Sequence, residues 1–243
     1  MTVREEIEQF CGYFRDQVQV IQSVALDAER ANGTDQESHQ TTFYKKVLLV
    51  TQIDTIAGIR YSTNRYPKLH RSNHDRFIKF LNDHQIWPLG GTVSIPFVRE
   101  AGTGGRLSNG KLKTEIENRF NHHFEPDAYH IDCALIDMDY SELLELSSNE
   151  QEEALLREYT HYELLYRYRN YLVHEGRVPG NAMEIGDDER PYYHSYLGED
   201  KLFLAYPLNL FVSLASQSID NLEQYLTFNQ FNPYDFVSET SIW

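Results

Sequence analysis

Cysteine is scarce in this chain of 243 residues, with Cys11 and Cys133 as its two examples. They lie far apart and belong to no Cys-x-x-Cys or Cys/His spacing, so the sequence contains neither a disulfide framework nor a zinc motif. This usage favours a reducing compartment, and we expect a cytoplasmic protein.

A long apolar run is also missing. The most apolar stretch, residues 202–215, is interrupted by Pro207, Asn209 and Ser213, so it is too short and too broken to cross a membrane. The N-terminus begins with charged residues and predicts no signal peptide. Because 41% of the residues are apolar, the chain can bury one sizeable core, and we predict a single soluble domain with no membrane partner.

Basic residues are few relative to acidic ones, and the formal net charge is −15. This argues against a general affinity for nucleic acid. The charge is unevenly distributed, however: residues 38–80 hold eight basic and two acidic side chains, a balance of +6, whereas residues 112–163 hold three and fourteen, a balance of −11. The first segment predicts a cationic face for RNA and the second an acidic face for a basic partner, and two solvated faces without a partner are an equal alternative.

Apolar periodicity predicts a mainly helical protein. The capping-box spacing Thr2-x-x-Glu5 begins a first helix that should end near Asn32 and Gly33. Further helices are expected at 47–59, from Ser72 to about 81, at 111–120 and at 207–228. Residues 92–98 alternate as a short strand does, residues 102–110 form a Gly-rich loop, and residues 192–197 and 202–206 predict a β-hairpin. The segment 127–139 is ambiguous.

Residues 147–174 contain no Pro or Gly and predict one long helix, which Gly176 and Pro179 terminate. Its apolar and aromatic residues form two stripes. A helix that is apolar on two sides is usually buried on two sides, here by its own domain and by a second subunit.

The end of this helix carries Arg167, Arg169, Asn170 and His174. At about 100° per residue, Asn170 and Arg167 share a face with His174, whereas Arg169 lies roughly 140° away and must reach around the helix or face a partner. An arginine beside a proton-transferring histidine suits RNA cleavage, which needs a base for the 2′-hydroxyl, an acid for the 5′-oxygen and a cation for the phosphorane charge. The alternative is structural: the arginines pair with acids such as Glu163, and His174 caps the helix.

Residues 169–174 read Arg-Asn-Tyr-Leu-Val-His, which resembles the R-x4-6-H signature of the HEPN superfamily. The flanking Tyr-x-x-Arg-Asn and Val-His-Glu-Gly strengthen the resemblance, which covers about a dozen residues and does not extend to the N-terminal 140. It implies a HEPN-like helical bundle in residues 141–243, with a small β-hairpin and a helical N-terminal extension in residues 1–140. It also implies Arg169 and His174 as the catalytic pair and Asn170 as a supporting polar group.

The resemblance therefore leads us to expect a metal-independent endoribonuclease in a toxin–antitoxin or antiviral setting, active as a homodimer without a cofactor. RNA is the expected partner, together with a cognate antitoxin or sensor protein. Arg167, Lys45, Lys46, Arg71 and Arg76 are the expected substrate contacts. A non-catalytic HEPN-like module that binds nucleotide, RNA or a partner protein is the alternative.

Two other patterns suggest different functions. Gly105-x4-Gly110-Lys111 has most of a P-loop, but Leu112 stands where Ser or Thr should hold magnesium, so a nucleotide hydrolase is the weaker hypothesis. The polar residues around 122–132, which are His122, His123, His130 and Asp132, show no helical i, i+4 pair, and we expect no metal there.

Overall fold

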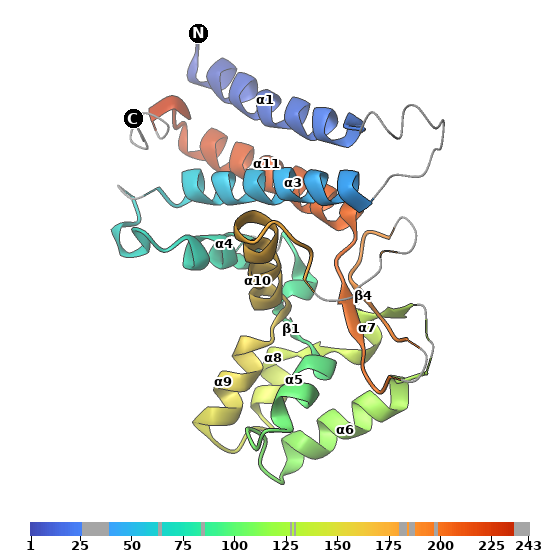
Figure 1. Cartoon of the computed structure of the whole chain (residues 1–243). Helices are drawn as coiled ribbons and strands as arrows, with labels where there is room; N and C mark the ends of the chain where they lie inside the picture. The colour runs from blue at the N-terminus through green and yellow to red at the C-terminus, as the bar shows by residue number, and fades with distance from the viewer. Residues whose placement is uncertain are drawn as a thin grey trace. The chain divides into compact units, whose positions relative to one another are not determined.

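The computed structural model describes residues 1–25, 39–62, 65–83, 86–126, 128, 130–179, 184, 188–196 and 199–235. Over these residues the chain is mainly helical, as predicted (Figure 1). In the described part of the chain, no helix is long and apolar enough to span a membrane.

The chain divides into two compact units. The first unit consists of Met1–Ile86, Arg169–Val178 and Phe211–Trp243, and the second of Trp87–Tyr168 and Pro179–Leu210. This division does not coincide with the boundary near residue 140 that the sequence suggested, because the chain returns twice to the first unit. The end of the motif-bearing helix, from Arg169 onward, belongs to the first unit.

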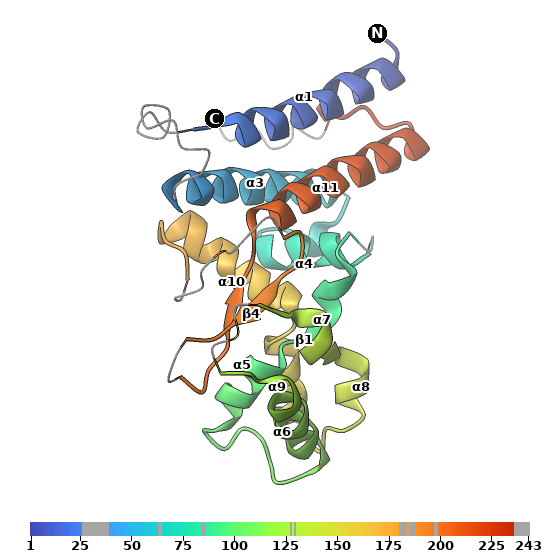
Figure 2. The same ribbon diagram turned by 90° about the vertical axis from the view of Figure 1, so that its right-hand side faces the viewer.

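The first unit is built from helices. They are α1 (Val3–Ser23), α3 (His39–Arg60), the short η1 (Pro67–Leu69), α4 (Asn73–Asp83), the last turns of α10 (His161–His174) and most of α11 (Leu208–Asn229). Figures 1 and 2 show α1, α3 and α11 side by side. Together with α4, these helices form an apolar core in which Leu49, Ile53, Phe77, Phe80 and Leu222 are fully buried.

Polar contacts fix the three long helices of this unit against one another. The amide of Gln52 on α3 donates to the carbonyl of Phe14 on α1 over 2.8 Å. Arg15 on α1 pairs with Asp220 on α11 over 2.7 Å. The guanidinium of Arg60 on α3 lies 3.6 Å from the centre of the Tyr225 ring on α11, so each pair of helices has at least one specific contact besides apolar packing.

The predicted start of α1 is confirmed and its predicted end is wrong. Thr2 Oγ1 accepts from the Glu5 amide at 3.3 Å, and the Glu5 carboxylate accepts from the Thr2 amide at 2.7 Å, which is the complete capping box. The helix ends at Ser23 because Val24 turns to an extended conformation. Asn32 and Gly33 lie outside the described residues.

The second unit surrounds a core of its own with short helices and two small sheets. The helical elements are η2 (Pro88–Gly91), α5 (Ile95–Gly102), α6 (Lys111–His123), α7 (Cys133–Ile136), α8 (Tyr140–Leu144), α9 (Glu150–Glu158) and the first turns of α10. One antiparallel sheet has the order β2 (Ile131–Asp132), β4 (Tyr192–His194), β5 (Phe203–Ala205), and the other pairs β1 (Thr92–Val93) with β3 (Met138–Asp139). Val93, Ile95, Ile116, Leu155 and Tyr193 lie in the core of this unit.

The predicted strand at 92–98 is wrong beyond Val93. Ser94 accepts a hydrogen bond from the Phe97 amide and thereby caps α5, and Pro96 occupies its first turn. A side-chain cap followed by proline favours helix over strand, because proline has no amide hydrogen to donate and its φ is fixed near the helical value.

The long helix expected at 147–174 is also wrong, because it is divided into α9 and α10. Tyr159 leaves the helical conformation, with φ −113° and ψ 22°, and its carbonyl accepts from the Ser94 amide at 3.0 Å. Thr160 forms a bridge with Val93. Tertiary pairing with β1 therefore interrupts a segment that local propensity would keep helical.

The other predicted elements are confirmed. The helices expected at 47–59, 111–120 and 207–228 correspond to α3, α6 and α11, and the helix expected from Ser72 corresponds to α4. The hairpin is formed by β4 and β5, with Tyr193 opposite Leu204. Residues 197 and 198, between the two strands, lie outside the described residues.

Candidate functional site at the end of helix α10

The end of α10 is held in a defined conformation. The amides of Glu175 and Arg177 both donate to the carbonyl of Tyr171 at 3.2 Å. Gly176 has a φ of +64°, the left-handed conformation that glycine adopts without steric cost, and it ends the helix as predicted. The last turns, which carry the motif, are therefore fixed on their C-terminal side.

Arg169 is the centre of a hydrogen-bonded cluster at this end. Its Nη1 donates to Asn170 Oδ1 at 3.0 Å and lies 2.8 Å from His174 Nε2. Its Nη2 donates to Asp54 Oδ2, on α3, at 2.5 Å. The structure thus brings together the three predicted site residues and adds a fourth, all within the first unit.

The contact between Arg169 and His174 defines the hydrogen-bonding role of the imidazole. Arginine has only donors, so His174 Nε2 must present its lone pair, and the ring proton of this neutral form lies on Nδ1. Arg169 is 7% exposed, whereas the side chain of His174 is exposed to solvent. The imidazole therefore borders solvent, while its Nε2 is directed to the guanidinium of Arg169.

Arg169 reaches around the helix to His174, which is one of the two alternatives that the helical geometry left open. The two residues lie about 140° apart around an ideal helix. The long arginine side chain nevertheless spans this angle and contacts the imidazole. Arg169, with the poorer helical position, is the arginine that contacts His174.

Asp54 was not proposed as a site residue from the sequence. It is the one charged residue in the apolar stretch 47–59, and an acid in such a stretch is usually paired, because burying an isolated carboxylate is costly. This signal pointed to a partner, but nothing in the spacing identified Arg169. The side chain of Asp54 is 18% exposed and that of Arg169 is 8% exposed, so water screens their attraction only in part.

Arg167 has different surroundings in the second unit. Its guanidinium donates to the carbonyl of Glu158 and lies 4.8 Å from the centre of the Tyr159 ring. Both partners belong to the junction between α9 and α10. Arg167 therefore supports the turn that the sequence analysis did not foresee.

The residues predicted to contact RNA are not equally accessible. Lys45 and Lys46 are 3% and 0% exposed, and Lys45 Nζ donates to the carbonyl of Gln22 at 2.7 Å. Arg71 is exposed, and Arg76 is half-buried and donates to Asn73. Arg71 and Arg76 are thus accessible to solvent at least in part, whereas the burial of the two lysines argues against the role proposed for them.

The P-loop hypothesis loses its structural context. In the described stretch 86–126, the loop before Lys111 follows helix α5 and not a strand. A P-loop requires a strand, the loop and a helix in succession.

The residues of the 122–132 region do not converge. His130 pairs with Asp188 over 3.2 Å and stacks on Tyr192, and Asp132 Oδ1 accepts from the Ala134 amide. They form no metal cluster among the residues that the structure describes.

No family model matches this chain, and neither a curated protein nor a solved structure is found to be similar to it. The site itself and the resemblance of its motif are therefore the two grounds for proposing a function.

Proposed function

We propose that the protein is a metal-independent endoribonuclease whose active site contains Arg169 and His174. The observation that carries the proposal is the 2.8 Å contact between Arg169 Nη1 and His174 Nε2, which places a fixed cation beside a basic nitrogen at an exposed helix end. Cleavage by 2′-hydroxyl attack needs this pair of groups.

In the proposed reaction, His174 Nε2 accepts the proton of a ribose 2′-hydroxyl while Arg169 Nη1 turns from the imidazole to a phosphate oxygen. The 2′-oxygen bonds to phosphorus and the bond to the 5′-oxygen breaks. The products are a 2′,3′-cyclic phosphate and a 5′-hydroxyl. The 5′-oxygen takes its proton from a general acid, for which the His174 of a second chain is the candidate in the proposed homodimer.

Asp54 and Asn170 are positioning residues in this scheme. Each accepts one hydrogen bond from the guanidinium, so they fix its plane and keep Nη1 directed toward His174. A preformed arrangement of this kind needs little reorganisation when the phosphorane charge develops.

The biological setting is proposed from the motif resemblance. Unregulated RNA cleavage harms the cell that carries it, so an antitoxin or sensor protein is the expected partner, in toxin–antitoxin or antiviral defence. Arg71 and Arg76 are the candidate contacts with the RNA chain outside the site.

A non-catalytic binding module is the second candidate, and the ion pair with Asp54 favours it. An arginine that is 7% exposed and already paired with a carboxylate is a weaker phosphate ligand than a free one. In this interpretation the cluster fixes the end of α10, and the protein binds RNA, nucleotide or a partner protein without cleaving it.

The test compares wild-type protein with His174→Ala on mixed cellular RNA in EDTA, with mapping of the new ends. His122→Ala is the matched control, because His122 is also an exposed histidine in the last turn of a helix. A second substrate carries 2′-deoxyribose at the mapped position, which removes the attacking oxygen and leaves the phosphate in place.

The proposal expects 2′,3′-cyclic phosphate ends with wild type and His122→Ala, and no cleavage with His174→Ala or with the 2′-deoxy substrate. Circular dichroism and the oligomeric state should be unchanged in both variants. Retention of RNA by wild type without cleavage of any RNA class would overturn the proposal and favour the binding module.

A further inference from the structure

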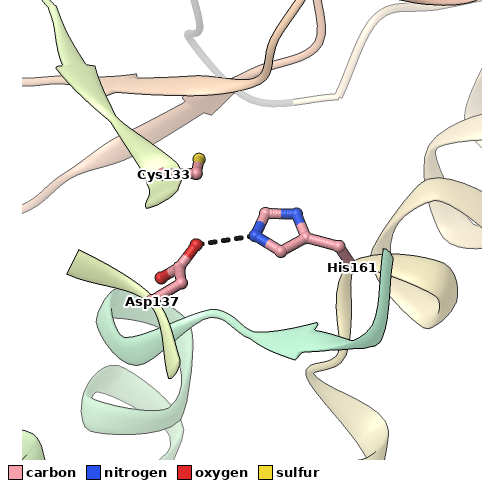
Figure 3. A group of neighbouring side chains, drawn as sticks. All are labelled: Cys133, Asp137 and His161. Carbon is pink, nitrogen blue, oxygen red and sulfur yellow. Dashed lines mark hydrogen bonds and ion pairs between the residues drawn. The ribbon is translucent and has the colours of Figure 1, made fainter. Parts of the chain in front are cut away.

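Three side chains with metal-binding atoms meet in the interior of the second unit (Figure 3). Cys133 is the first residue of α7, Asp137 directly follows α7, and His161 is the first residue of α10. They are 0%, 5% and 0% exposed. One sulfur, one oxygen and one nitrogen atom lie within 4.8 Å of one another.

The backbone positions this group well. The amide of Cys133 donates to the carbonyl of Pro191 at 3.4 Å, and that of Asp137 donates to the carbonyl of Cys133 at 2.8 Å. The second bond closes one helical turn and places the thiol and the carboxylate at i and i+4, on one side of α7. His161 reaches them from a different element, as Figure 3 shows.

A shell of hydrogen bonds orients Asp137 and His161. Asp137 Oδ1 accepts from the Ile95 amide at 3.0 Å, and Asp137 Oδ2 accepts from the Tyr193 hydroxyl at 2.9 Å and lies 2.7 Å from His161 Nε2. His161 Nδ1 lies 3.1 Å from the Tyr206 hydroxyl. Metal-ligating histidines and carboxylates usually have outer partners of this kind.

A cysteine hydrolase does not explain the cluster. A catalytic histidine must contact the thiol with one nitrogen and the acid with the other. In His161, Nε2 is directed to Asp137 and Nδ1 to Tyr206, so neither nitrogen serves Cys133. Cys133 is also fully buried, so its thiol is not exposed to any substrate.

We propose that Cys133, Asp137 and His161 bind one Zn²⁺ ion as a closed structural site. Sulfur and imidazole ligands favour zinc over magnesium or calcium, and the second oxygen of Asp137 provides the fourth donor atom. No metal was expected from the sequence, because Cys133 and Asp137 lie in one short turn, His161 lies in a different element, and the three together match no zinc spacing motif.

The charges and protons of the proposed site balance. The Cys133 sulfur loses its proton to solvent when zinc binds. The His161 proton moves from Nε2 to Nδ1, where it is donated to the Tyr206 oxygen. A thiolate, a carboxylate and a divalent cation sum to zero, which removes the cost of a single carboxylate charge in a buried cluster. The site lies in a different unit from Arg169 and His174, so it neither requires nor supports the ribonuclease proposal.

The test measures the metal content of the full chain, expressed with zinc and purified without chelator, by mass spectrometry. We expect about one zinc ion per chain in wild type and a loss of at least tenfold in Cys133→Ser and His161→Gln. Cys11→Ser is the matched control, because Cys11 is also a fully buried free cysteine but lies in the first unit. It should retain the metal.

A second measurement needs no variant. Wild type stripped of metal in denaturant with chelator and refolded with Co²⁺ should show the thiolate-to-cobalt charge-transfer absorption, which reports a bound cysteine directly. Wild type without stoichiometric metal and without this absorption would overturn the proposal. Zinc retained by folded Cys133→Ser would also overturn it, because the metal would then be bound elsewhere.

Discussion

The carboxylate of Asp54 accepts a hydrogen bond from the guanidinium of Arg169 over 2.5 Å, although 115 positions separate the two residues in the sequence. The pair joins α3 to the end of α10 within the first unit. Because both side chains are largely buried, the pair is a stability element as well as a part of the candidate site.

Asp54→Asn should lower the free energy of unfolding by about 1–3 kcal/mol, because it leaves the charge of Arg169 uncompensated in a largely buried position. The side chain of Asp54 keeps some contact with solvent, which limits the cost. Urea unfolding measures the effect. Glu8→Gln is the control: it removes the exposed Arg4–Glu8 pair and should cost less than about 1 kcal/mol. An equal loss of unfolding free energy in the two variants would contradict a stabilising role for the Asp54–Arg169 pair.

Arg169→Lys should reduce the proposed cleavage by a factor on the order of 10²–10³, because an ammonium cannot contact Asp54 and His174 at once and cannot hold a phosphate in the same plane. Arg167→Lys should leave cleavage close to wild type, since Arg167 contacts the α9–α10 junction. Single-turnover rates on one mapped RNA substrate decide between the arginines. A larger loss in Arg167→Lys would reverse the assignment.

The sequence predicted the helices that carry strong periodicity or explicit caps, and it failed where distant pairing decided the structure. The division of 147–174 illustrates this. Thr160-x-x-Glu163 has the spacing of a new helix start, and the Glu163 amide donates to Thr160 Oγ1 at 3.4 Å. The decisive contacts, with Val93 and Ser94, come from elsewhere in the chain and leave no local pattern.

The candidate site was predictable to a similar extent. The motif identified Arg169, Asn170 and His174, since it depends on residues close in sequence. Asp54 was visible only as a lone acid in an apolar helix, and its partner depends on the packing of α3 against α10. The cluster of Cys133, Asp137 and His161 had no sequence signal at all. Cys133 and Asp137 lie in the ambiguous segment 127–139, and His161 lies in the segment that was expected to be one long helix.

Glu152 provides a prediction for pH. Burial by itself raises the pKa of Glu152, but hydrogen bonds from Ser108 and Ser148 outweigh burial, so the pKa lies below its usual value. The carboxylate accepts the Ser108 amide at 2.9 Å and the Ser148 amide at 2.7 Å, as well as both hydroxyls. The ionised form therefore stabilises the fold above the unfolded-state pKa, and this stabilisation is lost as pH falls through the folded-state pKa.

Glu152→Gln should consequently lower the free energy of unfolding at pH 7 by about 1–3 kcal/mol and should weaken the loss of stability in acid. Chemical unfolding at pH 7 and at pH values near and below the glutamate pKa measures both effects. Glu150→Gln, at an exposed position in the same first turn of α9, should preserve the acid dependence. If the free energy of unfolding falls in acid as steeply for Glu152→Gln as for wild type, this carboxylate is not the cause of the acid dependence.

Gly90 lies directly against the ring of Tyr162 in the second unit. A Cβ atom at position 90 would lie 2.5 Å from Cδ1 and 2.6 Å from Cζ of the Tyr162 ring, and the ring is held by a 2.9 Å hydrogen bond from its hydroxyl to the carbonyl of Trp87. Gly90→Ala should therefore destabilise the protein by about 1–3 kcal/mol, because ring or backbone must move.

Gly58→Ala is the matched control. Gly58 lies inside α3, where a Cβ atom would meet nothing within 4 Å, so alanine should stabilise the protein by about 0.5–1 kcal/mol by reducing the freedom of the unfolded chain. Thermal and urea unfolding should thus shift in opposite directions for the two variants. If the clash with the ring is the cause, Tyr162→Ala should cost less in the Gly90→Ala background than in wild type, because the ring that collides is then absent; additive costs would show that position 90 is strained for another reason.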